Sequence, residues 1–291
     1  MPRLYVVATP IGNLSDISPR ALETLREADL IAAEDTRVTR ALLNHFDIST
    51  PCVSNHQHNE ESRAQPLVER MLEEDLTVAV VTDAGTPCIS DPGCVLVREA
   101  AAAGIEVLAV PGPTAMASAI SVSGFDAREF AFYGFLPRQK KELREKLLSI
   151  ARSGVPIAVV HESPHRVIDL VRAIVETLPG CRISASCDLT KLYEKTVRGD
   201  AQEVLEALLA NEKAEKGEYC LVLDLHDVQL PETEAASSAS LEAQLFEELL
   251  SGSDLREAGE RLMERGAKRN DVYRARTNVQ RFLQDLTSEE A

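Results

Sequence analysis

The sequence contains no tryptophan, and only 4% of its 291 residues are aromatic. Proteins that recognise single-stranded nucleic acid by stacking bases on aromatic rings use more such surface. Any recognition of nucleic acid is therefore expected to depend on phosphate contacts and on shape. Phe132, Tyr133 and Phe135 form an aromatic cluster, for which we expect packing within a strand.

Long apolar runs are also missing. No stretch approaches the roughly 18–20 uncharged apolar residues that a membrane span needs, and Met1-Pro2-Arg3 leads directly into a predicted strand rather than into a signal peptide. The six cysteines form no C-x-x-C pair, and His56-Gln57-His58 lacks a third ligand. We expect a cytoplasmic protein with free thiols, no membrane contact and no metal site.

Positive charge is scarce overall but locally concentrated. The net charge of −16 argues against a protein that binds nucleic acid with its whole surface. Residues 261–281, however, hold seven basic and two acidic side chains, and residues 138–152 hold six basic and two acidic ones. Each segment alone is equally well explained as a solvated helix face. Together they favour local anchoring of a polyanion.

The first part of the chain alternates strands and helices. A length of 291 residues predicts more than one domain. Ser18-Pro19 and Asp91-Pro92 each look like an N-cap followed by proline at the first helical position. Alternating elements with apolar strands predict a parallel sheet covered by helices, in a domain spanning 1–124. The expected strands are 3–8, 29–33, 51–54, 76–82 and 105–110, and the expected helices are 18–28, 36–46, 59–74, 92–103 and 113–122.

A second α/β domain is expected over 125–228. Strands follow one another around 181–199 without a helix between them, which predicts a mixed sheet with a hairpin. The composition of 229–240 is typical of a linker, and 241–291 is expected to form a small, basic helical appendage. The expected strands are 129–134, 155–161, 181–187, 193–199 and 218–225, and the helices are 139–152, 164–178, 200–211, 241–251, 253–265 and 268–285.

Three predicted strands of the first domain run into loops of glycine, proline and small polar residues: Thr9–Asn13, Asp83–Pro87 and Pro111–Thr114. Loops at the carboxyl ends of parallel strands form the ligand crevice of open α/β sheets. The first loop has a single glycine instead of G-x-G-x-x-G, and no G-x-x-x-x-G-K-[ST] occurs. Dinucleotide and P-loop sites are therefore poor fits, and the residues alone predict a compact, nucleotide-like cofactor.

The order and spacing of several short motifs are specific in combination. These are Ala8–Leu14, Ala33–Arg37, His58–Glu60, Asp83–Pro87 with Asp91–Gly93, Pro111–Thr114, Gly134–Pro137, Glu162–Arg166, Leu189–Lys191 and Lys216–Glu218. In this set the chain resembles the tetrapyrrole methylase family over residues 3–225. Within that family it is most similar to enzymes that methylate the 2′-hydroxyl of a cytidine in small-subunit (16S) ribosomal RNA.

The resemblance implies a homodimer that binds S-adenosylmethionine between two α/β domains and acts on the small ribosomal subunit. It implies cofactor contacts from Thr9, Pro10, Gly12, Asp83, Ala84, Gly85, Thr86, Ser90, Pro111, Ala115, Gly134, Lys216, Gly217 and Glu218. Expected substrate contacts are Arg37, His58, Asn59, Arg166, Lys268, Arg269 and Arg274.

Methyl transfer to a ribose hydroxyl requires an acceptor oxygen aligned behind the methyl carbon and a base or cation that assists the weak nucleophile. The candidates are Glu34, Asp35, His58, Glu162 and Lys191. Our hypothesis is a carboxylate base from Glu34-Asp35, with Lys191 and Arg37 orienting the RNA or stabilising charge. The alternative for Asp35 and Arg37 is an ion pair that caps helix 36–46.

Two positions depart from the pattern that the resemblance implies. Cys187-Asp188 stands where Arg-Glu is usual before Leu-Thr-Lys, and His161 replaces a common tyrosine. Both changes affect the expected substrate side more than the cofactor side. A methylase of another acceptor, such as a corrin or tetrapyrrole precursor, and a noncatalytic RNA-binding protein on the same scaffold remain as alternatives.

Overall fold

The structure is a computed structural model that describes residues 1–57, 59–230 and 240–288. It divides into two compact units, Met1–Gln229 and Leu230–Ala291. Most of the expected linker 229–240 lies outside the described residues, as does His58.

The first sheet is fully parallel, which confirms the prediction. Its strands lie in the order β3-β2-β4-β1-β5, so the three loop-bearing strands are direct neighbours. Consecutive strand residues face opposite sides, and both sides are apolar and buried. The strands are β1 (Arg3–Val7), β2 (Leu30–Ala33), β3 (Cys52–Ser54), β4 (Thr77–Val81) and β5 (Glu106–Val110).

Helices cover both faces of this sheet. Helices α1 (Pro19–Glu27) and α2 (Thr36–His45) supply Leu25 and Leu43 to one core, and α3 (Glu60–Glu74) and α4 (Cys94–Ala102) supply Met71 and Leu96 to the other. Ser18 caps α1 and Pro19 occupies its first turn, as predicted. A short 3₁₀ helix, Leu14–Asp16, was not expected from the sequence.

The predicted start of α4 is wrong. The helix begins at Cys94 with Gly93 as its N-cap, and the φ of +127° at Gly93 lies in the region that favours glycine. The cap comes instead from α3: Glu60 Oε1 accepts hydrogen bonds from the backbone N–H groups of Gly93 (2.6 Å) and Val95 (2.9 Å). Asp91-Pro92 therefore stays in the loop before α4, and a buried carboxylate from a distant helix fixes the end of that loop.

The second sheet is mixed, also as predicted. Strands lie in the order β6-β7-β10-β8-β9; β6 pairs with β7 in parallel and the other pairs are antiparallel, including the expected β8–β9 hairpin. The strands are β6 (Phe130–Phe135), β7 (Ile157–Glu162), β8 (Arg182–Cys187), β9 (Lys195–Asp200) and β10 (Tyr219–Asp224).

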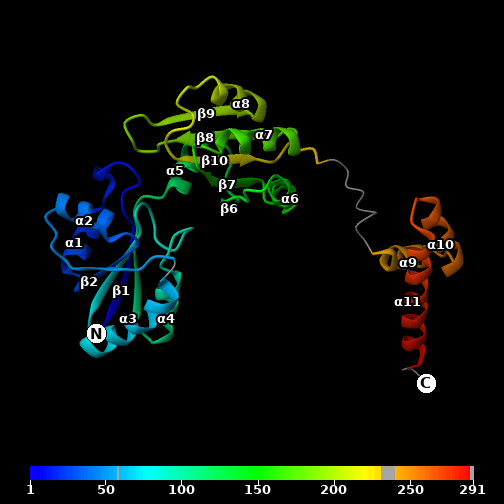
Figure 1. Cartoon of the computed structure of the whole chain (residues 1–291), viewed down its shortest axis with the longest axis horizontal. Helices are drawn as coiled ribbons and strands as arrows, with labels where there is room; N and C mark the ends of the chain where they lie inside the picture. The colour runs from blue at the N-terminus through cyan, green and yellow to red at the C-terminus, as the bar shows by residue number, and fades with distance from the viewer. Residues whose placement is uncertain (58, 231–239, 289–291) are drawn as a thin grey trace. The chain divides into compact units, whose positions relative to one another are not determined.

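Helix α5 (Ala115–Ser123) precedes Gly124 in the chain, yet it packs against β7, β8 and β10 of the second sheet. Ile11, from the first domain, packs against the same apolar cluster. Helices α6 (Lys140–Ala151), α7 (Val167–Thr177) and α8 (Ala201–Leu209) contact one another in sequence, and α8 packs against β8 and β9 (Figure 1).

The second unit holds three helices in its described part, α9 (Leu241–Leu250), α10 (Leu255–Glu264) and α11 (Arg269–Ser288). Their core contains Leu245, Leu262 and Val279. Arg261 and Arg265, two of the basic residues of 261–281, both pair with Glu248 of α9. Part of the positive charge of 261–281 therefore holds these helices together. No helix in the described part of the chain is long and apolar enough to cross a bilayer.

We expect Glu60→Ala to lower the free energy of unfolding by about 1–3 kcal/mol, because two buried N–H groups lose a charged acceptor. Chemical denaturation followed by circular dichroism measures the change. The control is Glu61→Ala, whose side chain is 80% exposed and lies 4.0 Å from Arg98; it should change stability by less than about 0.5 kcal/mol. Equal effects of the two substitutions would contradict the capping role.

Candidate functional site

The three glycine- and proline-containing loops of the first sheet are held to one another. The backbone N–H of Thr9 donates to Gly85 O (2.8 Å), and the N–H of Gly85 donates back to Thr9 O (3.1 Å). Thr86 Oγ1 donates to Pro113 O at 3.2 Å, which joins the second loop to the third. The carboxyl edge of the sheet is therefore a cross-linked rim, as the neighbouring positions of β4, β1 and β5 require.

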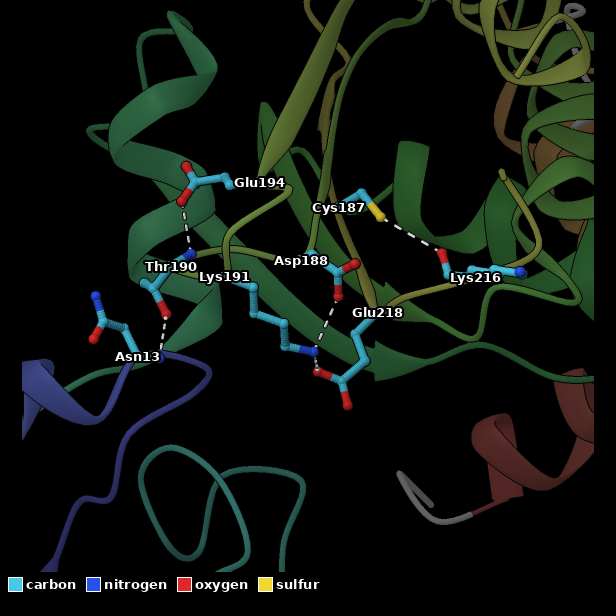
Figure 2. A network of polar contacts seen from close by, with 8 residues as sticks. All are labelled: Asn13, Cys187, Asp188, Thr190, Lys191, Glu194, Lys216 and Glu218. Carbon is cyan, nitrogen blue, oxygen red and sulfur yellow. Dashed lines mark hydrogen bonds and ion pairs between the residues drawn. The ribbon is translucent and has the colours of Figure 1, made fainter. Parts of the chain in front are cut away.

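A loop of the second domain closes onto this rim at Gly12. A Cβ at Gly12 would lie 2.5 Å from Lys191 Cγ and 3.0 Å from Leu189 O, so only glycine permits this close approach. The N–H of Asn13 donates to Thr190 Oγ1 at 3.1 Å (Figure 2). The β8–β9 loop thus touches the first loop directly.

A cavity of about 330 Å³ lies where the two domains meet, within the size range of about 300–1,000 Å³ typical of ligand sites. Its apolar wall comes from Ile11, Ile89, Ala115, Phe135 and Leu189. The polar groups that line it are Ser90, Asp91, His161, Glu162, Ser163 and Glu218. An adjoining cavity of about 50 Å³ is lined by Gly85, Thr86, Asp91 and His161, among others.

Three carboxylates of the first domain, Glu34, Asp83 and Asp91, influence one another through their charges, and Asp91 lines the cavity. Glu34 Oε2 accepts hydrogen bonds from Thr82 Oγ1 and from the N–H of Asp83 (3.2 Å), so its role is to hold the end of β4. Burial, with a contribution from Glu34, raises the pKa of Asp83. Burial followed by the charges of Glu34 and Asp83 raises the pKa of Asp91 to about 6.

Asp35 has a different environment. Its carboxylate accepts the N–H of Arg37 (2.8 Å) at the start of α2 and pairs with the Arg37 guanidinium at 2.6 Å. Hydrogen bonding from the Arg37 side chain, and then from its backbone, lowers the pKa of Asp35 to about 2. The capping ion pair considered in the sequence analysis is therefore present, and a carboxylate of such low basicity is a weak general base.

Lys191 lies at the centre of a polar network (Figure 2). Its Nζ is 2.8 Å from Glu218 Oε2 and 3.0 Å from Asp188 Oδ1. Burial opposes the charge of Lys191, but the bonds to Glu218 and Asp188 outweigh it and raise the pKa. The amine is therefore a fixed cation beside the cavity.

His161 presents a polar atom without a partner. Its Nε2 is buried and has no hydrogen-bond partner among the described residues, and the residue lines both cavities. Burial lowers the pKa of the imidazole, which keeps it neutral at neutral pH. The rings of Phe132 and Phe135 meet it edge-on at centroid distances of 5.0 and 5.8 Å. The cavity thus offers a ligand a neutral hydrogen-bonding group in an aromatic wall.

The residues expected to bind a cofactor fall into several groups. Ala84, Ser90, Ala115 and Glu218 line the cavity, and Gly85 and Thr86 line its small extension.

Other members of the set shape these walls. A Cβ at Gly134 would lie 2.8 Å from Ser90 Oγ, and one at Gly217 would lie 2.5 Å from Asp188 Oδ2. Thr9, Pro10 and Asp83 line a separate pocket of about 320 Å³ against α2. Pro111 is exposed just after β5, and Lys216 lines a groove outside the cavity.

The residues expected to contact substrate are not gathered in one place. Arg166 donates to Leu136 O and Pro137 O and pairs with Glu162 at 3.3 Å, so its guanidinium is engaged inside the second domain. Asn59 Oδ1 accepts the N–H of His56. The Arg37 side chain is 88% exposed. Lys268, Arg269 and Arg274 belong to the second unit, where all three are exposed.

Several lining residues were not selected from the sequence. Asp91 and Ile89 lie in a loop that the motifs mark, so their position was a usable signal. Phe135 was assigned to strand packing, but its 61% exposure leaves the ring free to face the cavity. Tyr219 and Cys220 of β10 read as ordinary strand residues, and no local pattern distinguishes them.

We expect Thr190→Val to increase deuterium uptake at Asn13, because the substitution removes the acceptor of the Asn13 N–H and costs about 1 kcal/mol. Thr190→Ser keeps the hydroxyl and is the matched control. Hydrogen exchange read by mass spectrometry over Thr9–Asn13 tests this. Unchanged protection in the valine variant would show that the loops are held together by other contacts.

Comparison with known proteins agrees with this arrangement. Residues 3–205 match the family model of tetrapyrrole (corrin/porphyrin) methylases. The chain is 46% identical to Ribosomal RNA small subunit methyltransferase I of Halalkalibacterium halodurans, over 76% of this chain and 75% of that protein. It is 43% identical to the protein of the same name from Vibrio cholerae, over 79% of this chain and 81% of that protein.

The fold is similar to that of a solved uroporphyrin-III C-methyltransferase from Thermus thermophilus, complexed with S-adenosylhomocysteine. The TM-score is 0.52 at 20% sequence identity, over 76% of this chain and 97% of that one. The family match covers most of the first unit, and the fold consists of a parallel and a mixed sheet whose loops meet around one cavity. The chain therefore belongs to the tetrapyrrole methylase family.

Proposed function

We propose that the protein methylates the ribose 2′-hydroxyl of a cytidine in small-subunit ribosomal RNA, with S-adenosylmethionine as methyl donor. The observation that carries this proposal is the cavity between the two sheets, formed by the motif loops of a chain 46% identical to a protein named for small-subunit rRNA methylation.

The lining of the cavity fits this cofactor. Apolar side chains such as Ile11 and Leu189 suit a purine ring and a methionine chain, and His161 Nε2 supplies an unused hydrogen-bonding position. Bound there, S-adenosylmethionine would supply an electrophilic methyl group on a positively charged sulfur. The carboxylates of Asp91 and Glu218 favour a cationic ligand, and the neutral imidazole of His161 does not repel one.

Asp91 fits the role of general base better than Asp35. It lines the cavity, and its pKa of about 6 leaves it ionised at neutral pH yet basic enough to accept a proton from the hydroxyl. Glu34 tunes it through its charge, whereas Asp35 is held by Arg37. Lys191 is a positioning residue, since its amine links Asp188 to Glu218 while its stem packs over Gly12.

The RNA would be held mainly through its phosphates. The exposed cations Lys268, Arg269 and Arg274, concentrated in one segment of an otherwise acidic chain, are suited to phosphate contacts, and the exposed Arg37 would add one while paired with Asp35. We further propose that the substrate is presented by the small ribosomal subunit and that the enzyme acts as a homodimer.

The decisive experiment uses labelled S-adenosylmethionine and small ribosomal subunits from a strain that lacks this gene. We expect one labelled cytidine in the rRNA, modified on its ribose, when fragments are mapped by mass spectrometry. Subunits from the parent strain, which already carry the methyl group, are the control and should accept no label. Label in a small metabolite with none in rRNA would overturn the proposal in favour of another acceptor.

We expect the wild-type rate with bound cofactor to rise as pH increases through about 6, because Asp91 must lose its proton to act as the base. Asp91→Asn should lower kcat by about 100-fold or more and remove this rise. Asp35→Asn keeps a good N-cap and should retain a near-normal rate. Calorimetry with S-adenosylmethionine checks that both variants bind cofactor. Loss of activity in the Asp35 variant alone would return the base to Asp35.

A further inference from the structure

A second and larger hollow lies on the α8 side of the second sheet, with a volume of about 640 Å³. Its walls come from the β8–β9 loop, the end of α8 and the segment before β10. Within the first unit it is larger than the cavity between the two sheets; of the motif residues Lys216 lines it, and the proposed methyl transfer does not use it. We call it the Tyr193 groove.

The groove displays an aromatic ring that the fold does not bury. Tyr193 is 78% exposed and its neighbour Leu192 is 88% exposed, in a chain with only twelve phenylalanine and tyrosine residues. Lys213 Nζ lies 5.8 Å from the centre of the Tyr193 ring. An exposed ring beside a cation is the combination that binds an unpaired base and its phosphate.

The charge of the groove is favourable to an anion. Lys195, Lys213 and Lys216 line it, on a chain whose net charge is −16. Its two lining carboxylates are already engaged: Asp188 pairs with Lys191, and Glu194 Oε2 accepts the N–H of Thr190 at 2.6 Å. With Asp188 neutralised by Lys191, three lysines face the single carboxylate of Glu194, so the lining keeps a net positive charge.

The groove adjoins the cofactor cavity. Tyr219 lines both, and the turn at Gly217, with φ of +90°, separates Lys216 in the groove from Glu218 in the cavity. Figure 2 shows Lys216 pointing away from the pair formed by Lys191 and Glu218. Tyr219 and this turn are common to the borders of both hollows, which is the reason for assigning the groove to a nucleotide that neighbours the reacting one.

We propose that the Tyr193 groove binds an unpaired nucleotide of the RNA near the methylated residue, with its base stacked on Tyr193 and its phosphate held by Lys213 and Lys195. This inference rests on the proposed function, because it assigns the groove to the same RNA substrate. It supplies the base-stacking contact that the low aromatic content of the sequence argued against.

The test compares Tyr193→Ala, Tyr193→Phe and Lys213→Ala with wild type in methylation of small ribosomal subunits. We expect Tyr193→Ala to raise KM roughly tenfold, within the range produced by alanine substitution of base-stacking residues, while Tyr193→Phe stays near wild type. Lys213→Ala should raise KM and reduce the salt dependence of subunit binding by about one charge. Arg63→Ala, at an exposed position of α3, is the control for loss of a surface charge.

Affinity for S-adenosylmethionine, by calorimetry, should be unchanged in all variants. Wild-type KM in both the Tyr193→Ala and Lys213→Ala variants, with wild-type methylation of rRNA intact, would overturn the inference and leave the proposed function standing. A change of oligomeric state in Tyr193→Ala, by light scattering, would assign the groove to a second copy of the chain instead. Absence of rRNA methylation by the wild type would overturn the proposed function itself.

Discussion

The site depends on the missing side chain at Gly12. Because the first loop carries no Cβ there, the stem of Lys191 and the carbonyl of Leu189 approach its backbone, and the N–H of Asn13 reaches Thr190. Because of that contact, the loops of the parallel sheet form one side of the cavity. Leu189, Glu218 and the aromatic residues of the mixed sheet form the other side. A larger residue at position 12 would push these two sides of the cavity apart, although it would alter none of the ionisable side chains that line it.

Charge is used in two ways around this contact. Carboxylates such as Glu60, Glu34 and Asp35 are committed to backbone N–H groups and fix loop and helix ends. Within the described part of the chain no backbone N–H donates to the Asp91 carboxylate, and burial together with the charges of Glu34 and Asp83 raises its pKa to about 6. Glu34 is bound to a backbone N–H and acts on Asp91 only through its charge. This is how an acidic chain can raise the pKa of one carboxylate while its neighbours stay ionised.

Most of the fold could be predicted because local signals agreed with tertiary structure. Alternating apolar strands and the Ser18-Pro19 start gave the elements and the parallel sheet. The prediction for the start of α4 was wrong because the acceptor that caps this helix is Glu60, 33 residues before Gly93. No local sequence pattern indicates a cap that comes from another helix. Residues that line the cavity could be predicted where they lie on loops close to the sequence motifs, as Ser90 does. The places of Tyr219 and Tyr193 in the walls of the hollows could not be predicted, because they depend on how β8, β9 and β10 are paired.

The residues of the motif Lys216-Gly217-Glu218 have different positions, since Lys216 lines the groove and Glu218 lines the cavity. The left-handed turn at Gly217 places its two charged neighbours in different hollows, and a Cβ there would collide with Asp188. Asp188 in turn holds Lys191, which holds Glu218. Asp188, which lines the groove, and Glu218, which lines the cavity, are thus joined through the Lys191 amine. If RNA occupies the groove as we propose, these ion pairs would couple its binding to the wall of the cavity.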